Sequence, residues 1–223
     1  VALGPASRVA VLDAKTLKRI GDVGRYEDVD GDGIPYRTIP GTGMPAYFCR
    51  GSGHNEKGQY TERSDDYVNN IDRLARKFET ARQWVPRSTV DLDSTAEIGI
   101  IAYGTSHWAV LECRDQLSDE ADIVTSYLRV RAYPFTSELA EFIGEHERVY
   151  VVDQNRDAQM LSLMKLELAP ELQSRLRSVR HYTGLPIDAR SITDDILAQE
   201  GHRLTPSRAD ERHYPTSAGV GGE

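Results

Sequence analysis

Residues 97–113 read EIGIIAYGTSHWAVLEC, and this stretch decides the fold class of the chain. The apolar run at residues 98–102 is typical of a β-strand that is buried on both faces. Gly104 interrupts the run, and the Thr-Ser pair after it can cap a helix over residues 105–117. A strand, a glycine turn and a capped helix make the first half of a βαβ unit, and α/β proteins bind ligands at the turn that follows such a strand.

The alternation of strand and helix continues after this stretch. Helices that separate successive strands predict a mostly parallel sheet with right-handed crossovers. We therefore expect an α/β domain with a Rossmann-like, mostly parallel sheet over residues 96–200. Its last helix is expected to begin at a Ser-x-x-Asp capping pattern formed by Ser191 and Asp194. Further strands are expected at residues 122–130, 148–152 and 177–182, and further helices at residues 136–145, 157–168 and 191–199.

The part before this domain has a different composition. Residues 26–65 combine many glycines with scattered aromatic residues, which indicates a long ordered arm that packs on a neighbour. A helix is expected at residues 64–85, with Asp72 and Arg76 as an i,i+4 ion pair on its polar face. The apolar face of this helix consists of Tyr67, Ile71, Leu74, Phe78 and Val85.

The segments outside the arm and the α/β domain are expected to be connections. Residues 1–25 are interpreted as the remnant of an upstream linker, with one or two helical turns at residues 14–20. The arm and its helix occupy residues 26–95, of which residues 87–95 are a linker. Residues 201–223 mix Gly, Pro, Ser and Thr with charges of both signs and are expected to be a flexible tail.

Composition excludes several classes of function. The formal net charge of −8 argues against a nucleic-acid-binding surface. No apolar run approaches the roughly 20 residues that span a bilayer, and no signal peptide is visible. Cys49 and Cys113 lack metal-ligand spacing, which indicates two free thiols in a reducing cytoplasm. A cytoplasmic protein without a membrane or nucleic-acid partner is therefore expected.

Asp28, Asp30 and Asp32 lie in the sequence DVDGDG, which has the spacing of a calcium loop. Three carboxylates around a glycine turn supply part of the oxygen ligands that calcium or magnesium needs. The twelfth position is Ile39, where the complete motif has a bidentate glutamate. The alternative is an Asp/Gly turn that is held by hydrogen bonds from side chain to backbone.

A second group of polar residues lies in the glycine-rich arm. Arg50, Ser52 and His54 stand on the flexible sequence RGSGH and are able to hold an anionic group. The alternative is a packed loop in which Arg50 pairs with Glu56 or Glu62. No residue of the chain forms a recognisable nucleophile–base pair, so no catalytic residue is predicted.

The first βα turn is a third candidate, because backbone N–H groups at a helix N-terminus bind phosphate. A single glycine does not make the glycine-rich motif of dinucleotide-binding proteins, and the alternative is an ordinary helix cap. Asn155 follows the third expected strand, whose end should lie near the same turn. The candidates for anion binding or for an interface are Gly104, Thr105, Ser106, His107 and Asn155.

Five segments carry a family resemblance. They are DVDGDGIPYRTIPGTGMPAYFCRGSGHNEKGQYTE, YVNNIDRLARKFETAR, AYGTSHWAVLECRDQL, LRVRAYPFTSELAEFI and VYVVDQNRDAQM. In this order they resemble the α subunit of 2-oxoacid:ferredoxin oxidoreductases, closest to the 2-oxoglutarate branch. The resemblance runs from about residue 11 to residue 198 and covers only the C-terminal part of that subunit.

The resemblance implies a role in the oxidative decarboxylation of a 2-oxoacid to its acyl-CoA. The full complex would hold thiamine diphosphate, Mg and an iron–sulfur cluster, use CoA, and reduce ferredoxin. Its partners would be the β subunit and the N-terminal part of the α subunit, in an assembly that is expected to be a dimer. Residues 96–200 would be the transketolase C-terminal-like domain, which serves packing and assembly and is inactive alone.

The resemblance also ranks the candidate residues. No cofactor is expected to bind to this chain alone, since Gly31-Asp32-Gly33 lacks the buried strand and the helix of the thiamine diphosphate motif. Arg37 and the group Arg50, Ser52 and His54 become the candidates nearest to substrate or cofactor, and the first βα turn becomes an interface. The alternatives are a stand-alone α/β module that binds an anion or calcium, and an enzyme that acts through His107 or His54.

Overall fold

A computed structural model describes residues 15, 18, 24–38 and 50–202. The chain divides into two compact units, Val1–Pro86 and Arg87–Glu223. The expected remnant at residues 1–25 and the expected tail at residues 201–223 lie almost entirely outside the described residues, although Lys15 and Lys18 are helical. None of the helices in the described part of the chain has both the length and the apolar character that a membrane crossing requires.

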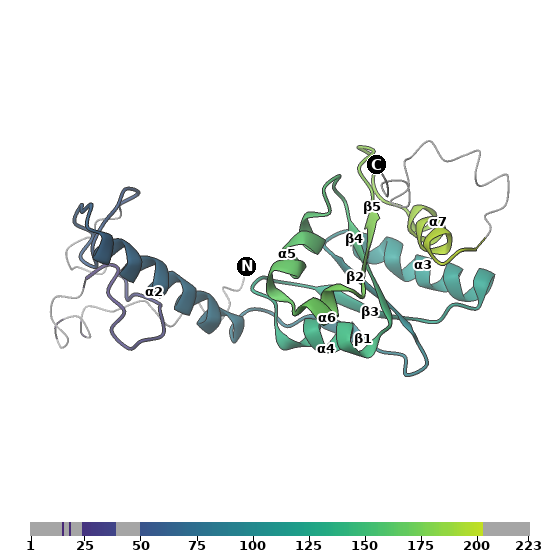
Figure 1. The fold of residues 1–223 in the computed structure, drawn as a ribbon, viewed down its shortest axis with the longest axis horizontal. Helices are drawn as coiled ribbons and strands as arrows, with labels where there is room; N and C mark the ends of the chain where they lie inside the picture. Colours follow the sequence, from purple (N-terminus) through teal and green to yellow (C-terminus); the bar gives the residue numbers. More distant parts are fainter. Residues whose placement is uncertain (1–14, 16–17, 19–23, 39–49, 203–223) are drawn as a thin grey trace. The chain divides into compact units, whose positions relative to one another are not determined.

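The second unit contains a five-stranded sheet with the strand order β1-β3-β2-β4-β5 (Figure 1). The four strands β2 to β5 are parallel to one another, and β1 pairs with β3 in the antiparallel direction. The expected mostly parallel sheet is therefore confirmed. Its strands are β1 (Thr89–Asp91), β2 (Ile98–Tyr103), β3 (Thr125–Val130), β4 (Arg148–Asp153) and β5 (Leu176–Arg180).

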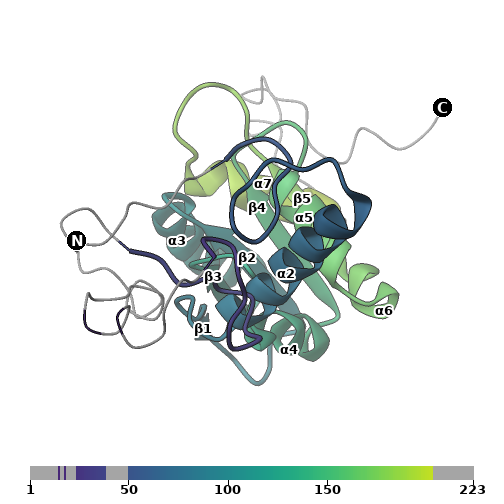
Figure 2. The same cartoon turned by 90° about the vertical axis from the view of Figure 1, so that its left-hand side faces the viewer.

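Helices cover both faces of this sheet (Figure 1 and Figure 2). One apolar core joins α3 and α7 to one face and includes Ile98 and Ile100 of β2, whereas the other joins α4 and α5 to the opposite face and includes Ile101. The alternation of neighbouring β2 residues between two cores confirms a strand that is buried on both faces. The helices are α3 (Ser106–Ala121), α4 (Ser137–Glu145), α5 (Gln159–Glu167), α6 (Pro170–Gln173) and α7 (Ala189–Gln199).

Three details of this unit differ from the expectation. The expected linker at residues 87–95 contains the edge strand β1, whose three residues are too few to show a period. The short helix α6 was missed, although Pro170 stands at its first position, where proline is favoured. The expected start of the last helix at Ser191 is wrong, because α7 begins at Ala189 and the side chain of Asp188 accepts a hydrogen bond from Ser191 N.

The first unit contains the helix α2 (Ser64–Arg82) and the described parts of the arm (Figure 1). Arg76 pairs with Asp28 of the arm at 3.0 Å, so the expected pair with Asp72 is wrong. Arg73 Nη1 donates to Gly33 O at 3.1 Å. Gly33 has φ +80°, and a Cβ atom there would lie 2.3 Å from the backbone nitrogen of Lys77. The arm therefore crosses the polar face of α2 at a point where only glycine fits.

Candidate functional site

The turn after β2 meets the turn after β4 at the carboxyl edge of the sheet. Gln154 Nε2 donates to Ser106 Oγ at 2.9 Å and to Thr105 Oγ1 at 3.2 Å. Gly104 has φ +59°, and its carbonyl oxygen accepts a hydrogen bond from Arg129 Nη2 at 3.3 Å. The hydroxyl groups of the first βα turn are therefore already bonded within the protein, which supports a structural role for this turn.

Asp153 is a fully buried carboxylate directly beneath this turn. Its Oδ1 accepts hydrogen bonds from Tyr103 Oη at 2.9 Å and from Asn155 Nδ2 at 3.0 Å, and its Oδ2 accepts one from Leu161 N at 3.3 Å. Burial and the negative charge of Asp153 raise the pKa of Tyr103 to about 12, so the phenol stays protonated and keeps donating. This network connects β2, β4 and α5, and its polar groups form hydrogen bonds with one another.

Asn155 has a second function at the same edge. Its Oδ1 accepts hydrogen bonds from the backbone nitrogens of Asp157 and Gln159 at 3.1 Å each. The second bond satisfies the N–H group of the first residue of α5, which lacks a partner within the helix, and the first bond closes the turn before it. The structure thus places Asn155 near the first βα turn and assigns it a capping contact.

His107 lies in the first turn of α3 and packs against Tyr127 of β3. Its Nδ1 is 3.2 Å from Tyr127 Oη, and the two rings are stacked with centroids 5.8 Å apart. Burial and the positive charge of Arg129 hold the pKa of His107 below its usual value, which keeps the ring neutral at pH 7. Burial raises the pKa of Tyr127 to about 12. Among the described contacts of His107 there is no carboxylate, so the geometry does not support a catalytic triad.

Arg50 and His54 are brought together by Tyr26, a residue that sequence reasoning did not assign to a site. Tyr26 Oη accepts a hydrogen bond from Arg50 N at 3.0 Å, and the Tyr26 ring stacks on His54 with centroids 3.8 Å apart. Arg50 Nε donates to Gly58 O at 3.1 Å. Asn70 Nδ2 of α2 donates to His54 O at 2.6 Å. These bonds indicate a packed loop that is anchored to α2.

A groove of about 700 Å³ lies between this loop and the first half of α2. Ser52 and His54 are among its lining residues, together with Tyr60 and apolar residues of the helix. Arg50 and Arg37 do not line it, and Arg37 is exposed elsewhere in the arm. The structure therefore brings two of the four predicted substrate-proximal residues to one cavity.

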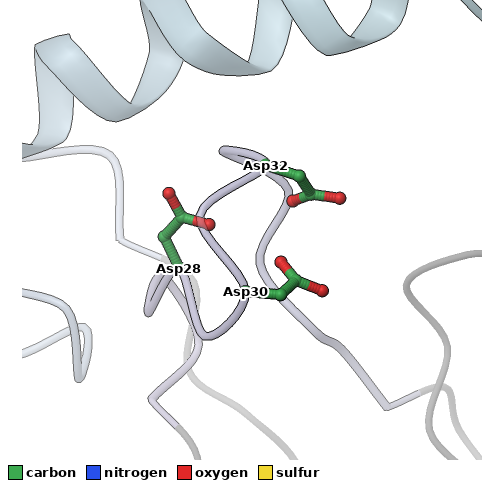
Figure 3. A group of neighbouring side chains, drawn as sticks. All are labelled: Asp28, Asp30 and Asp32. Carbon is green, nitrogen blue, oxygen red and sulfur yellow. The ribbon is translucent and has the colours of Figure 1, made fainter.

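The three carboxylates of the Asp loop lie close together, and each residue offers an oxygen within 4.8 Å of those of the other two (Figure 3). Asp28 Oδ1 accepts hydrogen bonds from the backbone nitrogens of Gly33 at 2.9 Å and Gly31 at 3.1 Å. Asp32 Oδ1 accepts one from Ile34 N at 2.7 Å, and Asp30 Oδ2 accepts one from Tyr36 Oη at 2.8 Å. The turn thus holds itself together by bonds from side chain to backbone.

Charges around the loop act on these carboxylates in opposite directions. Burial alone raises the pKa of Asp28, but the N–H of Gly33 and the Arg76 guanidinium outweigh it and leave the pKa lowered. Burial and the negative charges of Asp30 and Asp28 raise the pKa of Asp32, against the N–H of Ile34. Asp28 therefore belongs to the contact with α2, while Asp30 and Asp32 are the groups that a cation would neutralise.

Two features of the described residues argue against sites for thiamine diphosphate and for an iron–sulfur cluster. Gly33 lies against the backbone of α2 rather than at the end of a buried strand, so residues 31–33 cannot serve as a diphosphate loop. Cys113 is buried, which raises its pKa to about 12 and disfavours the thiolate that an iron–sulfur cluster needs. Residues 31–33 are therefore no site for thiamine diphosphate, and Cys113 is no ligand for a cluster.

Comparison with known proteins gives two informative similarities. No family model matches the chain. In an alignment over 167 residues that covers 71% of this chain, the chain is 30% identical to the α subunit of 2-oxoacid:ferredoxin oxidoreductase 2 from Aeropyrum pernix. The aligned part is 25% of that protein, so the chain spans about a quarter of the curated relative that it matches.

A solved structure shares the fold. It is the 2-oxoglutarate:ferredoxin oxidoreductase from Magnetococcus marinus with 2-oxoglutarate, coenzyme A and succinyl-CoA bound. The TM-score is 0.69 at 19% sequence identity, and the match covers 85% of this chain and 32% of that chain. The resemblance that the sequence indicates is therefore confirmed: the chain is similar in sequence to part of the α subunit of a 2-oxoacid:ferredoxin oxidoreductase, and it shares its fold with part of a solved 2-oxoglutarate:ferredoxin oxidoreductase.

Proposed function

We propose that this chain is the C-terminal part of the α subunit of a thiamine diphosphate-dependent 2-oxoacid:ferredoxin oxidoreductase in the cytoplasm. The observation that carries the proposal is the 167-residue match to the Aeropyrum pernix α subunit. The substrate is proposed to be 2-oxoglutarate, in agreement with the ligand of the Magnetococcus marinus protein, which shares the fold. The products are an acyl-CoA and reduced ferredoxin.

Within the complex, the chain is proposed to serve assembly and packing rather than chemistry. Two observations support this role. The polar groups at the carboxyl edge of the sheet are engaged with one another through Gln154 and Asp153. Residues 31–33 do not fit thiamine diphosphate, and Cys113 does not fit the cluster. Both would then be held by the N-terminal part of the α subunit and by the β subunit, the proposed partners of the chain.

The arm has a more specific role in this proposal. Ser52 and His54 line the groove beside α2 and are the described candidates for contact with substrate, CoA or a partner subunit. Ser52→Ala and His54→Ala in the assembled enzyme are expected to raise the KM for CoA or for the 2-oxoacid. The matched control is Ser118→Ala, since Ser118 lies on α3 in the other unit. Unchanged KM values for both substrates would show that Ser52 and His54 do not contact either substrate.

Calorimetry on the isolated chain tests the assembly role. We expect no heat of binding with thiamine diphosphate or with CoA, because the chain is proposed to contact these compounds only within the assembled enzyme. Co-expression with the β subunit and the N-terminal part of the α subunit is expected to give a complex that contains the chain. Tight binding of either cofactor by the chain alone would contradict a role limited to assembly.

Calcium binding is a second candidate function, favoured by the three carboxylates that lie within 4.8 Å of one another. Calcium would neutralise Asp30 and Asp32 and would raise the melting temperature of the first unit. Asp30→Ala and Asp32→Ala are expected to abolish this stabilisation, while Asp119→Ala on α3 serves as the control. If calcium leaves the melting temperature unchanged, the Asp loop is a hydrogen-bonded turn and not a calcium site.

A further inference from the structure

Arginine side chains gather at the carboxyl edge of the sheet. Arg129 lies at the end of β3, and Arg180 is the last residue of β5. Because β1 is antiparallel to β3, with Thr89 opposite Arg129, the residues before β1 reach the same edge. Four strand spacings separate β1 from β5, so this edge extends over about 19 Å. Its arginines, named here the arginine edge, are Arg87, Arg129, Arg131, Arg156 and Arg180.

Three guanidinium groups of the arginine edge bond only to the backbone within the described residues. Arg129, Arg131 and Arg180 each donate a hydrogen bond to a carbonyl oxygen, at 3.3, 3.5 and 3.1 Å. In the described part of the chain, none of the three forms an ion pair with a carboxylate. These bonds orient the side chains and leave their positive charge without a countercharge in direct contact.

The carboxylates near this edge are fewer than the arginines. Glu138 pairs with Arg87 at 2.8 Å, and Asp157 pairs with Arg156 at 2.7 Å. Asp188 is the N-cap residue of α7, where its side chain accepts a hydrogen bond from the helix. The edge therefore keeps an excess of positive charge.

The helices add to this positive charge. α3, α4, α5 and α7 each follow a parallel strand, so all four begin at the carboxyl edge. The N-terminus of a helix carries a positive partial charge, which an acidic residue in the first turn would offset. The first turns of α3, α5 and α7 contain no acidic residue. The arginine edge thus stands beside helix ends of the same sign.

The amino edge of the sheet is arranged in the opposite way. Arg148 of β4 lies 3.6, 3.0 and 2.9 Å from the carboxylates of Glu97, Glu147 and Glu200. Arg175 donates to three carbonyl oxygens at the end of α4, which carries the negative end of the helix dipole. These two positive charges are therefore compensated within the chain, in contrast to those of the arginine edge.

Exposed aromatic side chains lie at the carboxyl edge as well. Trp108 in the first turn of α3 is 74% exposed, and Tyr133 after β3 and Tyr182 after β5 are 46% and 42% exposed. Trp, Tyr and Arg are the residues that contribute most of the binding energy in protein interfaces. Neither the groove beside α2 nor the cavity beside Arg114 is lined by these residues. A long edge of this composition fits a protein surface better than a small molecule.

We propose that the arginine edge, together with Trp108, Tyr133 and Tyr182, docks on an acidic surface of another subunit of the oxidoreductase. The inference rests on the proposed function and gives the chemistry of the surface through which the chain joins the complex. Carboxylates of the partner would accept charge-assisted hydrogen bonds from the guanidinium groups, and the aromatic rings would supply apolar contact. A nucleic acid would bring a continuous row of phosphates, which the net charge of −8 opposes more than a local cluster of carboxylates.

Binding of the full chain to a co-expressed complex of the β subunit and the N-terminal part of the α subunit tests the proposal by biolayer interferometry. The double variant Arg131→Glu, Arg156→Glu reverses two exposed charges and is expected to weaken binding at least about tenfold. Trp108→Ala is also expected to weaken binding several-fold. Wild-type binding is expected to weaken between about 0.05 M and 0.5 M salt, because salt screens exposed charges. The double variant should lose most of this salt dependence.

The matched control is the double variant Lys165→Glu, Arg177→Glu, which changes the net charge by the same amount. Both residues are exposed, Lys165 in the last turn of α5 and Arg177 at the start of β5. This variant is expected to bind as the wild type does. Circular dichroism and thermal melting confirm that every variant is folded.

The possible outcomes separate this inference from the proposed function. Wild-type binding that the Arg131→Glu, Arg156→Glu variant retains in full would overturn the inference and leave the proposed function intact. An equal loss in the control would also overturn it, because net charge would then decide binding. No binding by the wild-type chain would contradict the proposed function, and this inference with it. A double-stranded DNA oligonucleotide that binds the wild type and not the edge variant would assign the edge to a nucleic acid and would overturn the proposal.

Discussion

The two units of the chain use their apolar side chains in opposite ways. In the second unit the apolar residues of β2 are buried in two cores, one on each face of the sheet. In the first unit α2 is held to the arm by hydrogen bonds from Arg73, Arg76 and Thr80. The side chains of Tyr67, Ile71 and Leu74 on the same helix are exposed. The second unit is therefore stabilised by apolar cores, whereas polar contacts between α2 and the arm hold the described part of the first unit together.

The largest expected effect is a loss of stability on truncation of the sheet core. Ile100 is fully buried, so Ile100→Ala is expected to lower the free energy of unfolding by about 2–5 kcal/mol. Ile71→Ala is the matched change in the first unit, and it should alter the stability of the monomer by no more than about 0.5 kcal/mol because Ile71 is half exposed. Urea unfolding followed by circular dichroism measures both values. Equal losses would remove the contrast between the units.

The second effect concerns the contact between the arm and α2. Gly33→Ala combines the strain of a positive φ with a collision against the backbone of Lys77, so it should cost more than the about 1–3 kcal/mol of strain alone. Gly31 also has a positive φ but has open space around it, so Gly31→Ala should cost the strain alone. Hydrogen exchange of the arm amides measures the difference. Equal protection in the two variants would mean that the close approach is absent in solution.

The third effect is a dependence of the stability of the contact between the arm and α2 on pH. The pKa of Asp28 lies below its ordinary value in the fold, so its stabilising contribution is present above the unfolded pKa of about 3.9 and is lost as the pH falls through the lower folded value. Asp28→Asn should weaken the arm by about 1.5–3 kcal/mol at neutral pH, the value of hydrogen bonds to a charged group, and should remove this part of the acid response. Hydrogen exchange of the arm between pH 7 and about pH 3 checks the prediction. If the arm of the variant loses protection at low pH to the same extent as the wild type, other carboxylates are responsible for the acid response.

The smallest effect is a local titration in the second unit. Burial and Arg129 lower the pKa of His107, so its ring should titrate below the ordinary value of about 6.5. The fold loses stability as the pH falls through this window, because the unfolded chain takes up the proton first. Arg129→Gln should move the midpoint upward by removing a positive charge. Nuclear magnetic resonance of the ring protons measures it, and a midpoint that does not move would exclude Arg129 as a cause.

The sequence predicted the second unit better than the first for a physical reason. A strand that is buried on both faces consists almost entirely of apolar residues, so β2 and its following helix could be predicted from residues 97–113. The parallel sheet was predicted from the alternation of strands and helices that follows. The edge strand β1 pairs with β3 through backbone hydrogen bonds, and its three residues are too few to show a pattern in the sequence. The contacts of the arm were likewise hidden, because Arg73 meets Gly33 across 40 positions of sequence.

The candidate sites show the same limit. Spacing alone brought together Asp28, Asp30 and Asp32, which the structure places on one turn. Spacing could not show that Asp28 forms an ion pair with Arg76, because Arg76 lies on α2, far away in the sequence. Tyr103 was also missed as a partner of Asp153, because the two residues come from different strands and meet only through the register of the sheet.

The central claim, that the chain is a part of a 2-oxoacid:ferredoxin oxidoreductase that contributes assembly, is tested most directly by reconstitution. The β subunit and the N-terminal part of the α subunit are prepared with and without this chain, and CoA-dependent reduction of ferredoxin by 2-oxoglutarate is measured. The proposal predicts ferredoxin reduction with the chain present, little without it, and none from the chain alone. Full activity of the other parts in the absence of the chain would contradict it.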